Sequence, residues 1–196
     1  MRTLISRVAA TVTLAAFAVG FLSAGCSRDA ANAPRDGGSL EVSILQRPVV
    51  GKLTVGEDEL AYTGSAEVQS DRDVVVDLGD DTIGSSMIEI PTDAIDELPP
   101  GLRVAMVKMK VNRLGEVSAD LGPNGLKFKK PVWLTLSYRG ADLNGIDEST
   151  LAIFYLNEDL AEPVWELVEG SVVDTELDAV RAPLSHFSRY AIGSDQ

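Results

Sequence analysis

The feature that most constrains the fold of this chain is a series of short apolar runs, separated by turn signals, between residues 122 and 192. In the clearest run, Val132 to Tyr138, every second residue is aliphatic or aromatic, which is typical of a strand with one buried face. Gly122-Pro123-Asn124-Gly125 precedes this run and predicts a turn. No helical periodicity extends beyond about twelve residues, the length at which pattern alone identifies a helix. The spacing therefore predicts an all-β fold, either a sandwich or a barrel.

The same reasoning predicts further strands along the chain. They are expected at Leu40–Ile44, Leu53–Val55, Asp73–Leu78, Leu102–Val111, Leu151–Leu156, Trp165–Val168, Val172–Val180 (with an acidic turn inside it) and Ser188–Ile192. The region 40–81 is marginal in length for a core of its own. We expect its strands to pack on the domain formed by residues 82–196, and a separate small subdomain stays open as the alternative.

The N-terminus has the pattern of a secretory signal. Arg2 and Arg7 precede an apolar run from Val8 to Leu22, which ends in small residues. The run is shorter than the ~20 apolar residues that cross a bilayer, so we do not expect a permanent spanning helix. The segment Leu-Ser-Ala-Gly-Cys resembles the bacterial lipobox, in which the cysteine receives a diacylglyceryl group and the chain is cut before it. The resemblance implies cleavage between Gly25 and Cys26; an ordinary signal peptide cut elsewhere is the alternative.

The expected anchor would hold an acidic protein. Removal of residues 1–25 takes away two of the 17 basic residues and none of the 30 acidic ones, so the formal charge changes from −13 to −15. This charge disfavours binding to nucleic acid and to anionic lipid surfaces. Cys26 is the only cysteine, which excludes an intrachain disulfide and a multi-cysteine metal site. We expect membrane contact through the lipid alone, with residues 26–39 as a flexible linker.

The expected location is the cell envelope, on the side that faces away from the cytoplasm. In Gram-negative lipoproteins an aspartate after the lipidated cysteine favours retention in the inner membrane, and here the residue is Ser27. Serine is compatible with export to the outer membrane if the host has one.

The later part of the chain resembles a known family. A turn, GPNGLKFKKPVWLTLSY (residues 122–138), an FYL strand, a tryptophan strand and LSHFSRYAI occur in that order. This order resembles the ZU-five domain of zonula occludens proteins, Unc-five netrin receptors and ankyrins. Met87 to Ile95 (MIEIPTDAI) resembles the opening of that domain, so the resemblance covers roughly Thr82 to Gly193. It implies an antiparallel β-sandwich that mediates protein contacts, and it implies no shared substrate.

The resemblance also implies one possible reaction. Some members of this and neighbouring families cut themselves within a His-Phe-Ser triplet, which matches His186, Phe187 and Ser188 here. Ser188 would attack the preceding carbonyl, His186 would accept its proton, and the Phe187–Ser188 bond would break. The alternative is structural: His186 and Phe187 close the core while the Tyr190 hydroxyl fixes the last strand. We expect the structural role, because many domains of this family carry the triplet without cutting.

Other chemistry is weakly indicated. Asp77, Asp80 and Asp81 could supply oxygens to calcium, but solvated turns are the simpler interpretation of such acidic clusters. The single histidine has no Gly-x-Ser-x-Gly segment beside it, so a conventional hydrolase is not expected, and neither is a cofactor. Trp133 and Trp165 leave glycan binding open. The sequence therefore predicts a lipid-anchored, non-enzymatic module that binds another envelope protein.

Overall fold

The computed structural model describes residues 42–48, 60–69, 71–95 and 105–195. The predicted signal peptide, Cys26, the linker and the strand at Leu53–Val55 lie outside these residues. In the described part the chain is all-β, without an α-helix, and its strands pair antiparallel. No described segment forms a helix with the length and apolar character to span a membrane. The prediction of an all-β fold is confirmed.

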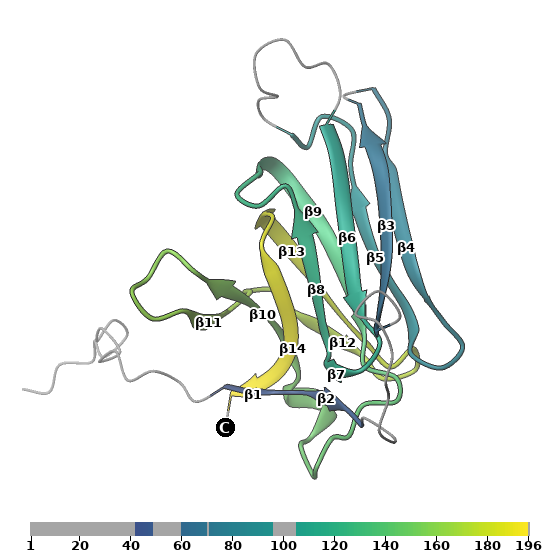
Figure 1. The fold of residues 1–196 in the computed structure, drawn as a ribbon, viewed down its shortest axis with the longest axis vertical. Coiled ribbons are helices and arrows are strands. Elements are labelled where there is room, and N and C mark those ends of the chain that lie inside the picture. The colour runs from purple at the N-terminus through teal and green to yellow at the C-terminus, as the bar shows by residue number, and fades with distance from the viewer. Residues whose placement is uncertain (1–41, 49–59, 70, 96–104, 196) are drawn as a thin grey trace, which may run out of the picture. The chain divides into compact units, whose positions relative to one another are not determined.

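The strands are numbered along the chain as in Figure 1. They are β1 (Val42–Ile44), β2 (Gln46–Arg47), β3 (Ala61–Val68), β4 (Val74–Asp80), β5 (Gly84–Ile90), β6 (Ala105–Asn112), β7 (Gly115–Glu116), β8 (Ser118–Gly122), β9 (Lys127–Ser137), β10 (Ala152–Asn157), β11 (Val164–Leu167), β12 (Val172–Asp174), β13 (Ala179–His186) and β14 (Arg189–Asp195).

The described strands are arranged in two main sheets. The seven-stranded sheet has the order β11-β10-β14-β8-β6-β3, and β1 also pairs with β14. The five-stranded sheet has the order β12-β13-β9-β5-β4, and β2 and β7 form a separate two-stranded ribbon. β3 pairs with β6 over eight residues and so belongs to the seven-stranded sheet. β4 pairs with β5 over seven residues and so belongs to the five-stranded sheet.

Both sheets contribute one face to a shared core. In β9, Val132, Leu134 and Leu136 are fully buried, and the residues between them are more exposed, as the alternation predicts. In β6, buried Val107 and Met109 alternate with exposed lysines. The buried residues of the two sheets belong to a single hydrophobic cluster. Apolar burial of this kind is the main favourable contribution to folding.

One strand prediction is correct in its acidic turn and wrong in its single strand. The segment Val172–Val180 is a hairpin rather than a single strand: β12 ends at Asp174, whose side chain accepts hydrogen bonds from the N–H groups of the turn, and β13 begins at Ala179. β13 continues to His186 and includes Pro183. Because the pairing with β12 ends at Arg181, β13 is an edge strand from there on. Proline is tolerated in such a position.

A buried arginine forms hydrogen bonds with backbone carbonyls from several parts of the chain. Arg47, in β2, has only 2% of its surface exposed. Its guanidinium donates to the backbone carbonyls of Ser137 (2.5 Å), Asn112 (2.8 Å), Arg139 (3.2 Å) and Ile83 (3.5 Å). Burial lowers the pKa of Arg47 to about 10, against a smaller raising effect of Asp80. The side chain therefore remains charged at neutral pH and satisfies carbonyl groups that come from three separate connections.

Candidate functional site

The predicted triplet lies where the chain passes from one sheet to the other. His186 ends β13 in the five-stranded sheet, and β14 of the seven-stranded sheet begins at Arg189. Phe187 is fully buried, and its ring meets that of Phe128 edge-on at 4.8 Å. The Phe187 N–H donates to the carbonyl of Leu126, and its carbonyl accepts from the Gly125 N–H at 2.9 Å. Phe187 therefore hydrogen-bonds the crossover to the turn before β9.

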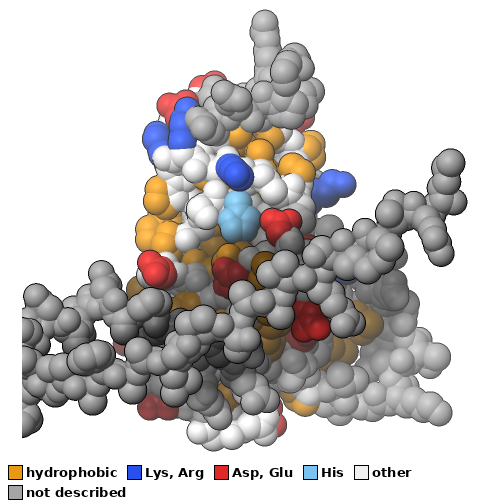
Figure 2. All heavy atoms as spheres, turned by 90° about the vertical axis from the view of Figure 1, so that its left-hand side faces the viewer, with side chains coloured by type: hydrophobic (Ala, Val, Ile, Leu, Met, Phe, Trp, Pro, Cys, Tyr) orange, Lys and Arg blue, Asp and Glu red, His pale blue; other side chains and the backbone are white. Residues whose placement is uncertain are grey.

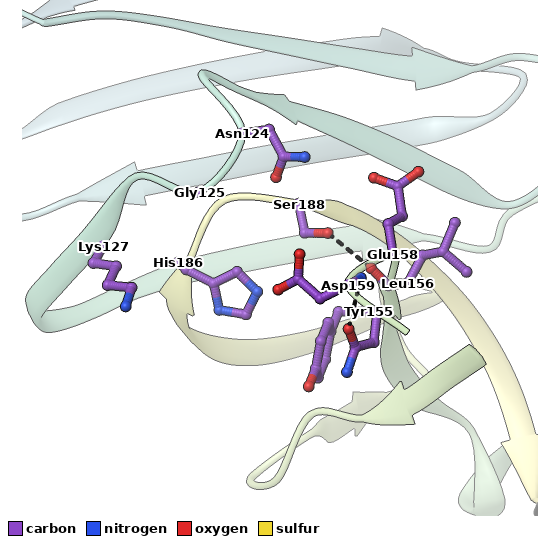
Figure 3. Close-up of a pocket in the computed structure, with 10 residues that line it drawn as sticks. Asn124, Gly125, Lys127, Tyr155, Leu156, Glu158, Asp159, His186 and Ser188 are labelled. Carbon is purple, nitrogen blue, oxygen red and sulfur yellow. Dashed lines mark hydrogen bonds between the residues drawn. The ribbon is translucent and has the colours of Figure 1, made fainter. Parts of the chain in front are cut away.

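Two hydroxyl groups fix the ends of this crossover. The Tyr190 hydroxyl donates to the His186 carbonyl at 2.6 Å. Ser188 is 7% exposed, and its hydroxyl donates to the carbonyl of Leu156 in β10 at 3.1 Å, as the dashed line in Figure 3 shows. The contacts of Phe187 and Tyr190 are those that the structural interpretation of the triplet expects.

The observed geometry does not assemble the groups that self-cleavage needs. The Ser188 hydroxyl is directed to the Leu156 carbonyl, while Nδ1 of His186 lies 3.2 Å from Oγ of Ser185. The partner of His186 is thus Ser185, and no hydrogen bond joins the described side chains of Ser188 and His186 as the nucleophile and base of the expected reaction. Among the described residues other than glycine, left-handed φ angles occur at Asp93, Asn144 and Asp178, all in turns. The triplet therefore carries no strain of that kind.

A pocket of about 390 Å³ opens beside the crossover. One wall comes from the turn before β9 and the start of that strand, with Asn124 and Lys127; the opposite wall comes from the end of β10, with Glu158 and Asp159 (Figure 3). Tyr155, His186 and Ser188 lie between them. Figure 2 shows the one histidine of the chain at the surface, with basic and acidic side chains next to it. Most of the residues that line the pocket are therefore polar or charged.

The rings at the base of the pocket are held in place. The Tyr155 and His186 rings meet edge-on at 5.1 Å. The Tyr155 hydroxyl donates to Glu166, which also accepts a 2.6 Å hydrogen bond from Nδ2 of Asn157. The hydrogen bond to Glu166, together with burial, raises the pKa of Tyr155 to about 12. Tyr155 is therefore neutral over the physiological range and contributes its ring and no charge.

The pKa of His186 is influenced by two neighbouring residues of opposite charge, Lys127 and Asp159. Partial burial lowers its pKa below the usual 6.5, Lys127 lowers it further, and Asp159 acts in the opposite direction. We expect the imidazole to be neutral at pH 7, Lys127→Gln to raise its pKa and Asp159→Asn to lower it. The measurement is an NMR titration of the imidazole Hε1 signal, which is unambiguous in an untagged protein with one histidine. A wild-type pKa above 6.5, or variants that shift it in the reverse directions, would contradict this electrostatic account.

The aspartates considered for calcium have other partners in the structure. Asp77 accepts from the Ser85 hydroxyl, and Asp80 accepts from the Tyr62 hydroxyl and from the N–H groups of Thr82 and Ile83. Asp81 is exposed in the turn that follows β4. Among the residues that the structure describes, no group of three or more His, Cys, Asp or Glu side chains is arranged to hold a metal ion.

The outer face of the five-stranded sheet carries an aromatic residue at its centre. Trp133 points away from the core, between buried Val132 and Leu134, and is half-buried. The Arg181 guanidinium lies 4.5 Å from the centre of its ring and forms an ion pair with Glu89 at 2.7 Å. Strand register sets four residues side by side across this face: Pro183, Trp133, Glu89 and Val75. We call these four residues and Arg181 the Trp133 face.

The second tryptophan occupies a different place. Trp165 lies in β11, the outermost strand of the seven-stranded sheet, and is also half-buried. Arg181 at Trp133, and Lys127, Tyr155 and Asp159 in the pocket, were not predicted as functional residues, because the neighbours of each lie far away along the chain and only the fold brings them close. The run Asn-Glu-Asp directly after the FYL strand was the one local signal of a polar wall.

A scan against protein-family models finds no family that matches this chain, and a search of curated proteins finds no relative.

Proposed function

We propose that this protein is a non-enzymatic module of a bacterial cell envelope that binds another envelope protein through the Trp133 face. A lipid on Cys26 attaches it to a membrane, on the side facing away from the cytoplasm, and residues 26–39 keep the folded part clear of the headgroups. In a Gram-negative host the membrane is the outer one. The support for the anchor is the signal-like N-terminus with its single cysteine after small residues.

We further propose that residues 82–196 form a ZU-five-like β-sandwich, to which the strands of residues 40–81 are added. Two antiparallel sheets around one core support this assignment. The segments that carry the resemblance also occupy central places in the fold: GLKFKKPVWLTL makes up most of β9, the middle strand of the five-stranded sheet, and LSHFSRYA contains the crossover between the sheets.

The observation that carries the proposed binding function is the exposed part of Trp133. Tryptophan and arginine are among the residues most enriched at binding hot spots, the interface positions at which substitution by alanine lowers affinity the most. Here they are in contact with each other, near the centre of the outer sheet face, and Val75, one strand beyond Glu89 on the same face, is 58% exposed. A half-buried ring held by an arginine loses little conformational freedom on binding. The Trp133 face therefore suits a protein surface with an apolar centre and polar margins.

The experiment is a comparison of two tryptophan variants in crosslinked cells. The partner that crosslinks to the wild-type protein is identified by mass spectrometry, and its affinity for the purified proteins is then measured. Trp133→Ala is expected to weaken binding by about 2 kcal/mol or more, roughly thirtyfold. Trp165→Ala removes the same side chain from the other sheet and should bind like the wild type.

Three results would count against the proposal. The first is that no specific partner is captured from solubilised membranes at any salt concentration. The second is that Trp133→Ala binds the partner as tightly as the wild type does. The third is that both tryptophan variants lose binding equally while remaining folded by circular dichroism, which would place the interface elsewhere.

A further inference from the structure

The pocket beside the crossover has walls of opposite charge. Lys127 and the Asn124 amide stand on the wall before β9, and the Glu158 and Asp159 carboxylates belong to the wall after β10. Figure 3 shows the Asp159 carboxylate turned toward the imidazole of His186, with Lys127 on the far side of that ring. The charges are therefore separated across the pocket rather than mixed along its rim.

These charged groups are not paired with each other. In the described part of the chain, no ion pair involves Lys127, Glu158 or Asp159. Water satisfies them in the free protein, since all three are exposed at the rim. Neutralising both walls at once requires a ligand with one anionic and one cationic group, because a ligand with a single charge leaves one wall unmatched.

We propose that this pocket binds a small zwitterion, an amino acid or short peptide, with its carboxylate toward Lys127 and Asn124 and its ammonium group toward Asp159 and Glu158. The volume of about 390 Å³ lies within the range of small-ligand sites. The Tyr155 and His186 rings both line the pocket and meet edge-on, so they offer the aliphatic part of the ligand two ring surfaces nearly at right angles. The Glu166 carboxylate accepts hydrogen bonds from the Tyr155 hydroxyl and the Asn157 amide, and the first of these keeps the Tyr155 ring in place.

The site is independent of the Trp133 face. Its residues come from the turn before β9, the end of β10 and the crossover, and Trp133 and Arg181 are not among the residues that line it. A protein without any partner at the Trp133 face could still bind the zwitterion, and the reverse also holds. The two proposals therefore fail or succeed separately.

Three peptides of nearly equal size provide the test. Ala-Ala carries both charges, N-acetyl-Ala-Ala lacks the ammonium group, and Ala-Ala amide lacks the carboxylate. Each peptide is titrated into untagged protein that has been purified in its naturally processed form. Binding is followed by the NMR signal of Hε1 of the one histidine and, separately, by calorimetry. Ala-Ala is expected to shift the His186 signal in a saturable way, and each single-charge peptide should bind at least about tenfold more weakly, which corresponds to about 1.4 kcal/mol.

Matched variants assign the effect to the two walls. Lys127→Gln and Asp159→Asn should each weaken Ala-Ala binding about tenfold, whereas Lys129→Gln and Glu162→Gln, which change exposed residues outside the pocket, should leave it unchanged. The proposal is overturned if Ala-Ala gives no saturable shift up to about 10 mM. It is also overturned if a single-charge peptide binds equally well, or if the control variants weaken binding as much as the pocket variants do.

Discussion

Replacing Arg47 by methionine is expected to lower the free energy of unfolding by about 3 to 5 kcal/mol, the largest effect of any single polar substitution that we expect in this chain. Methionine keeps the length and much of the volume of the side chain, and it removes every donor. Four backbone carbonyls, from Ser137, Asn112, Arg139 and Ile83, would then lose a partner. A buried polar group left unsatisfied costs about 1–3 kcal/mol, and relief from burying the guanidinium offsets part of this loss.

The measurement is urea unfolding followed by tryptophan fluorescence, with two companion variants. Arg47→Lys should be intermediate, because one ammonium group cannot reach carbonyls that a planar guanidinium contacts in several directions. Arg139→Met makes the same change at an arginine whose side chain is 43% exposed and paired with Asp178, and should cost less than about 1 kcal/mol. If Arg47→Met and Arg139→Met proved equally stable, the role assigned to Arg47 would be wrong.

Replacing Cys26 by serine is expected to abolish lipid attachment and normal processing completely. The lipobox resemblance requires the thiol for diacylglyceryl transfer, and cleavage follows that transfer. Two or three acyl chains hold a protein firmly, since each buried CH₂ contributes ~0.8 kcal/mol. Without them, an acidic protein with a formal charge of −13 has no attraction to an anionic membrane surface. The variant should therefore accumulate as an unlipidated precursor.

This outcome can be measured by labelling cells with an alkyne analogue of palmitate. Wild-type protein should carry the label and Cys26→Ser should not. A second variant, Cys26→Ser combined with Ser39→Cys, restores one thiol elsewhere in the linker and should also remain unlabelled. Processing and membrane attachment of Cys26→Ser at wild-type levels would show that the anchor is not a lipid on this residue.

The central strands could be predicted from the sequence because their pattern is strong. In β9 and β6, large apolar residues alternate with polar ones, and burial follows that alternation. β3 and β8 were not predicted, because their residues are mostly small. Gly64 in β3 shows the reason: a Cβ there would lie 2.8 Å from Cδ2 of Leu78 and 3.0 Å from Cγ1 of Val76, so the glycine leaves room for the β4 side chains to pack against β3. Glycine therefore weakens the strand signal at a position where side chains of a neighbouring strand pack closely.

The crossover and the polar sites were predictable to different degrees. His186, Phe187 and Ser188 were found because they are adjacent in the chain and resemble a family motif. Arg47 was missed, because arginine is mostly exposed and nothing local marks this one as buried. The pocket walls are contributed by Lys127 and Asp159, which meet only after β9 and β10 have joined different sheets. Tertiary contacts of this kind leave no periodic pattern in the sequence.

The intact mass of the protein purified from membranes tests the proposed anchored, uncut module most directly. The account predicts one species that begins at Cys26, carries a diacylglyceryl group and an N-terminal acyl chain, and ends at Gln196. A species without lipid, one that begins at another residue, or one that ends at Phe187 would contradict it.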